Sequence, residues 1–339
     1  MLPSLYQTVT AAIDQVLATQ EPVGAVVGVA EDGRLIYIQA FGTRNIAKHT
    51  PVNDDTRFEI ASITKQFTAA AILQLQEAGK LSIDDRLSTF FPAFPHANEI
   101  TLRELLNQTS GLPDYIAALP SDEPSTPGSL SVVASYEAGP LHFTPGTAWE
   151  YSNTNYYVLG KVIEHISKES FETYVRQHLF APAGMTHSAF LDDEPSLHDV
   201  AVGYWKGENG NLAVQPAPRA SDSWSGGAGS IVSTVADLMS WNDALSSGKI
   251  VSNADYALMS TPLTLPNHHN DRYGMGLGID VFDGQLRISH PGTMLGELAE
   301  DAVFPDARID IIVFENSAWG NPEAVEDAVF QAMFPNSDT

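Results

Sequence analysis

EIASITKQFTAAAILQLQEAG, residues 59–79, is the stretch from which the rest of the chain can be understood. Its apolar run and its closing Gly79 predict a buried helix over residues 62–79, because glycine is typical of the position just after a helix. Ser62 and Lys65, spaced three residues apart at the front of this helix, would share one face at a separation of about 5–6 Å. Either Ser62 is a helix cap beside an ordinary helix former, or it is a nucleophile beside its proton acceptor.

A serine hydroxyl attacks poorly unless a neighbouring group removes its proton, and a buried lysine with a lowered pKa can remove it. The free N–H groups at the start of a helix would also favour negative charge on the reacting oxygen. The spacing S-x-x-K decides nothing alone, since it occurs again at Ser246–Lys249. That second pair ends a helix at Gly248 and is interpreted as a solvated helix end. The role of Ser62 therefore depends on the remainder of the chain.

Sheet-forming sequence lies at the two ends of the chain, and helix and loop sequence lies between them. Asp-Gly pairs in the segments 31–33 and 283–284 separate strand-like runs and predict two β-hairpins, and residues 301–316 form a third hairpin-like unit. Residues 216–230 are predicted to be loop. Further helices are predicted at 4–19, 154–167, 170–180, 233–248 and 321–334, with a short one in the segment 101–111.

This order of elements predicts an α/β fold of the α+β type. An antiparallel sheet assembled from both termini would be flanked by the terminal helices, with an inserted mostly helical lobe. We expect one domain spanning residues 1–339, with a sheet lobe of residues 1–60 plus 270–339 and a mainly helical lobe of residues 61–269. The cleft between two such lobes is where a ligand site is expected.

Composition excludes several classes of partner and site. The net charge of −25, from 42 acidic and 17 basic residues, repels nucleic acid and anionic membranes. No apolar run is long enough for a membrane span, and the absence of cysteine excludes disulfides and thiolate chemistry. The first residues do not resemble a signal peptide, so the chain is cytoplasmic if Met1 is the native start and periplasmic or secreted if a leader has been removed. The oligomeric state does not follow from the sequence.

Two further motifs lie far from Ser62 along the chain. Tyr151-Ser152-Asn153 is the only Y-x-N and stands before a helix that we expect Asn153, Thr154 or Asn155 to cap. A tyrosine beside a lysine ammonium would have a lowered pKa and could act as a base, and Asn153 could accept a hydrogen bond from Lys65 while donating to a substrate carbonyl. The plainer interpretation is a loop tyrosine followed by a helix cap.

His290-Pro291-Gly292 is the only H-x-G and falls at the end of a predicted strand. A glycine there would allow a ligand to approach the strand backbone, and the next N–H, from Thr293, could then face a bound carbonyl oxygen. The plainer interpretation is a turn at the end of a strand.

The order S-x-x-K, Y-x-N, H-x-G resembles that of the serine β-lactamase and penicillin-binding-protein superfamily. The segments PGTAWEYSNTNYYVLGKVIE and GGAGSIVSTVADLMSW also read like segments of that superfamily. The resemblance is to the class C branch, which includes D-Ala-D-Ala carboxypeptidases, D-aminopeptidases and family VIII esterases. It covers nearly the whole chain and implies a β-lactamase/transpeptidase-like fold that uses no cofactor and no metal.

The resemblance also implies a role for each motif residue. Ser62 would attack the substrate carbonyl and become acylated, Lys65 and Tyr151 would share the proton, and water would then release the acyl group. The substrate-binding residues would be Asn153, His290, Gly292, Thr293 and Glu297, with the N–H groups of Ser62 and Thr293 forming an oxyanion hole. Which of Lys65 and Tyr151 is the base stays open.

Three positions differ from the superfamily pattern or indicate which of its members this chain resembles. Class C β-lactamases carry lysine where this chain has His290, which favours the peptidase and esterase members. Thr293 matches a position where carboxypeptidases hold a substrate carboxylate with a nearby arginine; Arg272 is the candidate, because Arg287 should point to the opposite face of its strand. Glu297 stands where an aromatic residue is common. An acid at the cleft mouth would bind a cationic or free-amine substrate, and the alternative is one more surface charge.

The sequence thus predicts a serine hydrolase that forms an acyl-enzyme on Ser62, with peptides containing D-amino acids as its substrates. A family VIII-type carboxylesterase or acyltransferase on small esters, or a weak β-lactamase, is the alternative on the same site. A non-catalytic binding protein would not need all the motif residues intact. The segment NHHND, residues 267–271, has no spaced partner motif and does not predict a metal hydrolase. Composition does not exclude a glycosidase with paired carboxylates, but no pair stands out.

Overall fold

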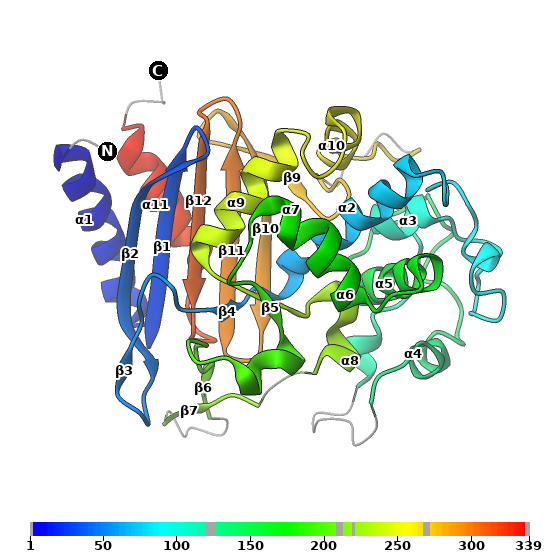
Figure 1. The fold of residues 1–339 in the computed structure, drawn as a ribbon, viewed down its shortest axis with the longest axis horizontal. Coiled ribbons are helices and arrows are strands. Elements are labelled where there is room, and N and C mark those ends of the chain that lie inside the picture. The colour runs from blue at the N-terminus through cyan, green and yellow to red at the C-terminus, as the bar shows by residue number, and fades with distance from the viewer. Residues whose placement is uncertain (1–2, 120–126, 208–212, 219–220, 267–271, 336–339) are drawn as a thin grey trace.

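A seven-stranded antiparallel sheet forms the centre of the molecule (Figure 1). The computed structural model describes residues 3–119, 127–207, 213–218, 221–266 and 272–335. The strands lie in the order β3-β2-β1-β12-β11-β10-β9. Their bounds are β1 Gly24–Glu31, β2 Arg34–Asn45, β3 Thr50–Pro51, β9 Gly278–Phe282, β10 Gln285–Met294, β11 Glu297–Phe304 and β12 Ile309–Glu315.

The sheet joins the two ends of the chain, as the sequence predicts. Strand β1 pairs with β12 over seven residue positions, which places the N-terminal hairpin beside the C-terminal strands. Asp32 and Gly33 both have positive φ, as do Asp283 and Gly284. This backbone suits two-residue turns whose twist matches that of the flanking strands, so both predicted Asp-Gly hairpins are confirmed.

The two terminal helices cover one face of the sheet. Helix α1 (Pro3–Gln20) and helix α11 (Pro322–Met333) lie side by side against it, and Figure 1 shows both chain ends on this side. Val9 and Ile13 of α1 and Val329 of α11 pack on alternate strand residues such as Val27 and Ile311. The opposite face packs on helix α9 (Val235–Ser246) and the helical region. The predicted fold class is therefore confirmed.

The helical region surrounds α2 (Thr64–Glu77), which is buried along most of its length. Lys80 N–H donates to the Leu75 carbonyl, Gly79 N–H donates to that of Gln76, and Gly79 has φ +66°, which together end the helix in a Schellman motif. The other helices are α3 Leu102–Leu106, α4 Leu130–Tyr136, α5 Asn153–Ser167, α6 Phe171–Val175, α7 Ala181–Ala183, α8 Asp222–Ser225 and α10 Asn253–Met259. The short strands are β4 Phe58–Glu59, β5 Ala189–Phe190, β6 Tyr204–Lys206, β7 Val214–Pro216 and β8 Ile231–Ser233.

Some local predictions are wrong, and each has a physical reason. The predicted loop at 216–230 contains helix α8, which Ser221 caps through the Ser223 N–H. Helix α5 has Ser152 at its N-cap position, and not Asn153, Thr154 or Asn155. The Ser152 hydroxyl donates to the Pro113 carbonyl and makes no cap bond. Helix α9 begins two residues later than the predicted 233, at Val235, because Thr234 is its N-cap. Helices α4 and α10, each only seven residues long, are too short to give a clear periodic signal.

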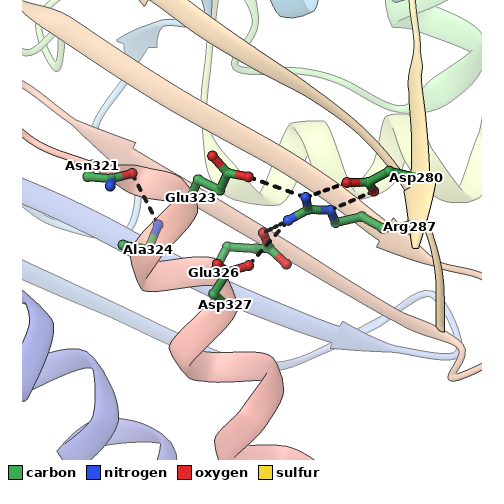
Figure 2. A network of polar contacts seen from close by, with 7 residues as sticks. All are labelled: Asp280, Arg287, Asn321, Glu323, Ala324, Glu326 and Asp327. Atoms are coloured by element: carbon green, nitrogen blue, oxygen red, sulfur yellow. Dashed lines mark hydrogen bonds and ion pairs between the residues drawn. The ribbon is translucent and has the colours of Figure 1, made fainter. Parts of the chain in front are cut away.

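Arg287 points to the α11 side of the sheet, as its strand position predicts. Its guanidinium bonds Asp280 on β9 and reaches Glu323, Glu326 and Asp327 on α11 (Figure 2). It thereby ties the edge of the sheet to the C-terminal helix. It cannot also hold a substrate carboxylate on the other face of the sheet.

Negative charge outnumbers positive charge around Arg287, so the stability of the protein should depend on pH. Burial, followed by the carboxylates of Glu326 and Glu323, raises the pKa of Glu300 well above its ordinary 4.5. The folded protein therefore holds a proton that the unfolded chain has lost near neutrality, and the free energy of unfolding falls as pH rises above 4.5. We expect Glu300→Gln to stabilise the protein by about 1–2 kcal/mol at pH 8 and by much less at pH 4.5, in thermal melts at both pH values. Equal effects at the two pH values would contradict this assignment.

Candidate active site

Ser62 lies in a tight turn, and not in the first turn of an α-helix. The 3-10 turn Ala61–Ile63 precedes α2, and Ala61 has φ +47°, a left-handed conformation that alanine rarely adopts. The Ile60 N–H donates to the Ile231 carbonyl at 3.0 Å, which fixes the turn to strand β8. Ser62 is therefore presented by a strained backbone that is anchored to strand β8.

Lys65 is fully buried one turn into this segment. Its Nζ lies 2.9 Å from Ser62 Oγ, 2.8 Å from Asn153 Oδ1 and 2.8 Å from the Ala228 carbonyl oxygen. Burial lowers the pKa of Lys65 to about 7, and the nearby Asp114 carboxylate opposes that shift. Near neutral pH the side chain therefore populates both its ammonium and its amine form.

Tyr151 lies against the same lysine, with Lys65 Nζ 4.9 Å from its ring centroid. Burial raises the pKa of Tyr151, and a hydrogen bond with Ser62 only partly offsets that rise. The prediction that a neighbouring ammonium lowers this pKa is wrong, because burial dominates and the Asp114 charge adds to the rise. Tyr151 is a neutral phenol at neutral pH.

Asn153 joins Lys65 to a carboxylate that the sequence analysis missed. Its Oδ1 accepts from Lys65 at 2.8 Å, and its Nδ2 donates to Asp114 Oδ2 at 2.9 Å. Asp114 lies in the segment SGLPDY, far from the other motifs along the chain. No local pattern distinguishes this acid from the many others of the acidic sequence.

His290 is buried beside Tyr151, with ring centroids 6.2 Å apart. Burial, followed by the Lys65 charge, lowers the pKa of His290 to about 3, so the ring is neutral. Its Nδ1 lies 2.7 Å from the Pro291 carbonyl oxygen and must donate there, which leaves Nε2 to accept from the Tyr273 hydroxyl at 3.1 Å. Tyr273 is a second residue that the sequence analysis missed, since it belongs to no recognised motif.

Gly292 is packed tightly against the segment that carries Ser62. A Cβ atom at position 292 would lie 2.3 Å from the Ile60 carbonyl oxygen. The glycine therefore lets strand β10 approach the protein's own backbone, whereas the sequence predicted the approach of a ligand. Thr293, the next residue, has an exposed side chain on the same strand.

We expect Gly292→Ala to lower kcat/KM by about 100-fold, because pushing β10 away from Ile60 misplaces groups around Ser62. The variant should lose about 1–3 kcal/mol of stability from the same overpacking. Steady-state kinetics and a thermal melt measure both effects. Unchanged kinetics in a folded variant would show that this contact does not position the site.

Glu297 is buried in the wall of a pocket that Glu59 also lines. Its side chain is 2% exposed, and its Oε2 accepts from the Glu59 N–H at 2.7 Å. The carboxylate thus bonds the backbone of strand β4, three residues before Ser62. The interpretation as a plain surface charge is wrong for this residue, and the amine-binding role stays a prediction.

Comparisons with known proteins show the family of this chain. Residues 9–333 match the family model described as Beta-lactamase. The chain belongs to the Beta-lactamase family. A Bacillus subtilis (strain 168) protein named as a penicillin-binding protein, PbpX, is 34% identical over 288 residues, which cover 85% of this chain and 69% of that protein. A D-aminopeptidase of Cereibacter sphaeroides is 29% identical over 300 residues, covering 86% of this chain and 56% of its own.

A solved structure extends the likeness to three dimensions. The D-stereospecific amidohydrolase of a Streptomyces species superposes with a TM-score of 0.82 at 27% identity, covering 96% of this chain and 98% of that chain. With hydrolases among its relatives and Ser62 bonded to a buried lysine, this β-lactamase-family protein is a serine hydrolase.

The structure adds little about two other segments that the sequence singled out, Arg272 and residues 267–271. Arg272 is exposed and directly precedes Tyr273, and it makes contacts of its own. The histidine-containing segment 267–271 lies outside the described residues. Among the residues that are described, no three histidine, aspartate or glutamate side chains are arranged to hold a metal ion, and no helix could cross a bilayer.

Proposed function

We propose that this serine hydrolase forms an acyl-enzyme on Ser62 and acts on amide bonds of peptides that contain D-amino acids. The observation that carries the proposal is the set of contacts around Lys65 Nζ. In the amine form the nitrogen keeps two N–H bonds, and the Asn153 and Ala228 oxygens can only accept. Both N–H bonds are thus directed to these oxygens, and the lone pair faces the Ser62 hydroxyl at 2.9 Å.

In the proposed reaction, Lys65 takes the Ser62 proton as Oγ bonds to the substrate carbonyl carbon. The N–H groups of Ser62 and Thr293 receive the negative oxygen. Breaking the amide bond releases an amine, which gains the transferred proton through Tyr151 or Lys65. Water then attacks the ester by the same route in reverse, which yields the acid and restores Ser62.

The choice of substrate rests on His290 and on the relatives. Lysine at this position would add a positive charge for an anionic substrate, whereas buried His290 is neutral. Proteins named D-aminopeptidase and D-stereospecific amidohydrolase are 29% and 27% identical to this chain. Both are enzymes named for D-substrates, which supports the same preference here.

A substrate panel tests the proposal. Matched D- and L-alanine p-nitroanilides, p-nitrophenyl acetate and nitrocefin would be compared by kcat/KM, beside intact-mass analysis after incubation with benzylpenicillin. We expect the D-anilide to exceed its L-isomer by at least about tenfold and benzylpenicillin to leave an adduct. Turnover of the acetate ester without either anilide would instead establish the esterase alternative, and rapid nitrocefin turnover would establish a β-lactamase.

A further inference from the structure

We propose that Asp114 is a positioning residue for the Ser62–Lys65 pair. Its carboxylate holds the side-chain amide of Asn153 in the one orientation that presents an oxygen to Lys65. The inference builds on the proposed function, because it concerns how the proposed base is kept ready to take a proton.

The orientation of the Asn153 amide follows from the chemistry of its two neighbours. A carboxylate can only accept hydrogen bonds, so the end of the amide that lies 2.9 Å from Asp114 Oδ2 must be the NH₂ group. The carbonyl end is then directed to Lys65 Nζ at 2.8 Å. If the amide flipped, its NH₂ group would face the N–H bonds of Lys65, and the lone pair of the amine would no longer be directed at Ser62.

The same segment that carries Asn153 also fixes the position of Asp114. The Ser152 and Thr154 hydroxyls each lie 2.7 Å from the Pro113 carbonyl oxygen, to which they donate. Thr154 Oγ1 also accepts from the Tyr115 N–H at 3.1 Å. The start of α5 therefore holds the peptides on both sides of Asp114, and Asp114 Oδ1 accepts from the Ile116 N–H at 3.1 Å.

Asp114 also supplies a negative charge close to Lys65. The groups around Lys65 are the Tyr151 and Tyr156 rings, with His290 also near enough for the lysine charge to lower its pKa. Both tyrosines have raised pKa values, and His290 is neutral. On the other side, burial raises the pKa of Glu137 to about 7, a shift to which the Asp114 charge adds. Removing the Asp114 charge should therefore make the Lys65 ammonium less stable.

Asp114→Asn is the sharpest test, because asparagine caps as well as aspartate and keeps an acceptor for the Ile116 N–H. The substitution removes the carboxylate charge, and either end of the Asn153 amide can then face the substituted side chain. Lysine labelled with ¹³C at Cε would report the titration of Lys65 directly by NMR, since the chain has only seven lysines and Lys65→Arg identifies the signal. Glu150→Gln is the matched control: Glu150 is an acid near Asn153 in the chain, but its carboxylate bonds His142.

We expect Asp114→Asn to move the Lys65 titration and the acid limb of kcat/KM to lower pH together, and to lower the plateau of kcat/KM about 10- to 100-fold. Glu150→Gln should move neither. An unchanged Lys65 titration in a folded Asp114→Asn variant would overturn the inference. Asp114→Ser, which keeps a capping oxygen, gives the same readout if the asparagine variant does not fold.

The NMR measurement needs no turnover, so the two proposals fail separately. If the wild-type protein forms no adduct on Ser62 but Asp114→Asn shifts the Lys65 signal, the proposed function is wrong and the positioning role stands. If the adduct forms and the signal does not shift, the positioning role is wrong and the proposed function stands.

Discussion

Ser62→Ala is expected to lower kcat/KM by at least about 10⁴-fold and to abolish the benzylpenicillin adduct. The reason is that Ser62 supplies the one hydroxyl among the described hydrogen-bond partners of Lys65 Nζ. Alanine removes only the Oγ atom, so the turn Ala61–Ile63 and its bonds to strand β8 should survive. Kinetics and intact mass of the same preparation measure the two losses together.

The chain offers its own control for this variant. Ser246 and Lys249 repeat the S-x-x-K spacing, but the Ser246 hydroxyl donates to the Asn242 carbonyl at the end of α9. We expect Ser246→Ala to keep full activity and to form the adduct. An adduct that persists in Ser62→Ala would show that another residue is the nucleophile.

Lys65→Arg is expected to lower kcat/KM by about 10³-fold across the whole pH range. Arginine keeps the positive charge and can donate to Asn153 and Ala228, but it does not lose its proton in proteins. In the wild-type protein the pKa of Lys65 is about 7, so the amine form increases as pH rises through 7. The acid limb of kcat/KM should therefore lie near pH 7 and should be absent from the residual activity of the variant.

The contrary result would identify a different base. If Lys65→Arg retained most of the activity, proton transfer would have to pass through Tyr151, whose pKa burial raises. The acid limb would then follow the tyrosine and lie at much higher pH. Pairing Lys65→Arg with Tyr151→Phe in one set of pH profiles separates the two residues.

The order of elements along the chain was enough to predict the sheet. Continuous apolar runs in β1 and β12, which are buried on both faces of the sheet, and Asp-Gly turns whose backbone twist suits hairpins, are local signals that survive in the folded protein. Short helices such as α8 and α10 were missed, because four to seven residues give no clear period.

The sequence by itself determined that its three motifs meet at one site. Ser62, Lys65, Tyr151, Asn153 and His290 lie together, as the resemblance predicted. The tertiary structure alone decided their electrostatics. Burial lowers the pKa of Lys65, in line with the apolar run around it. Burial of Tyr151, which no local pattern encodes, raises the pKa of that tyrosine, the reverse of the effect expected. The tertiary structure also placed Asp114 against Asn153 and Glu297 against the Glu59 backbone, because contacts between distant segments depend on how the sheet and helices pack.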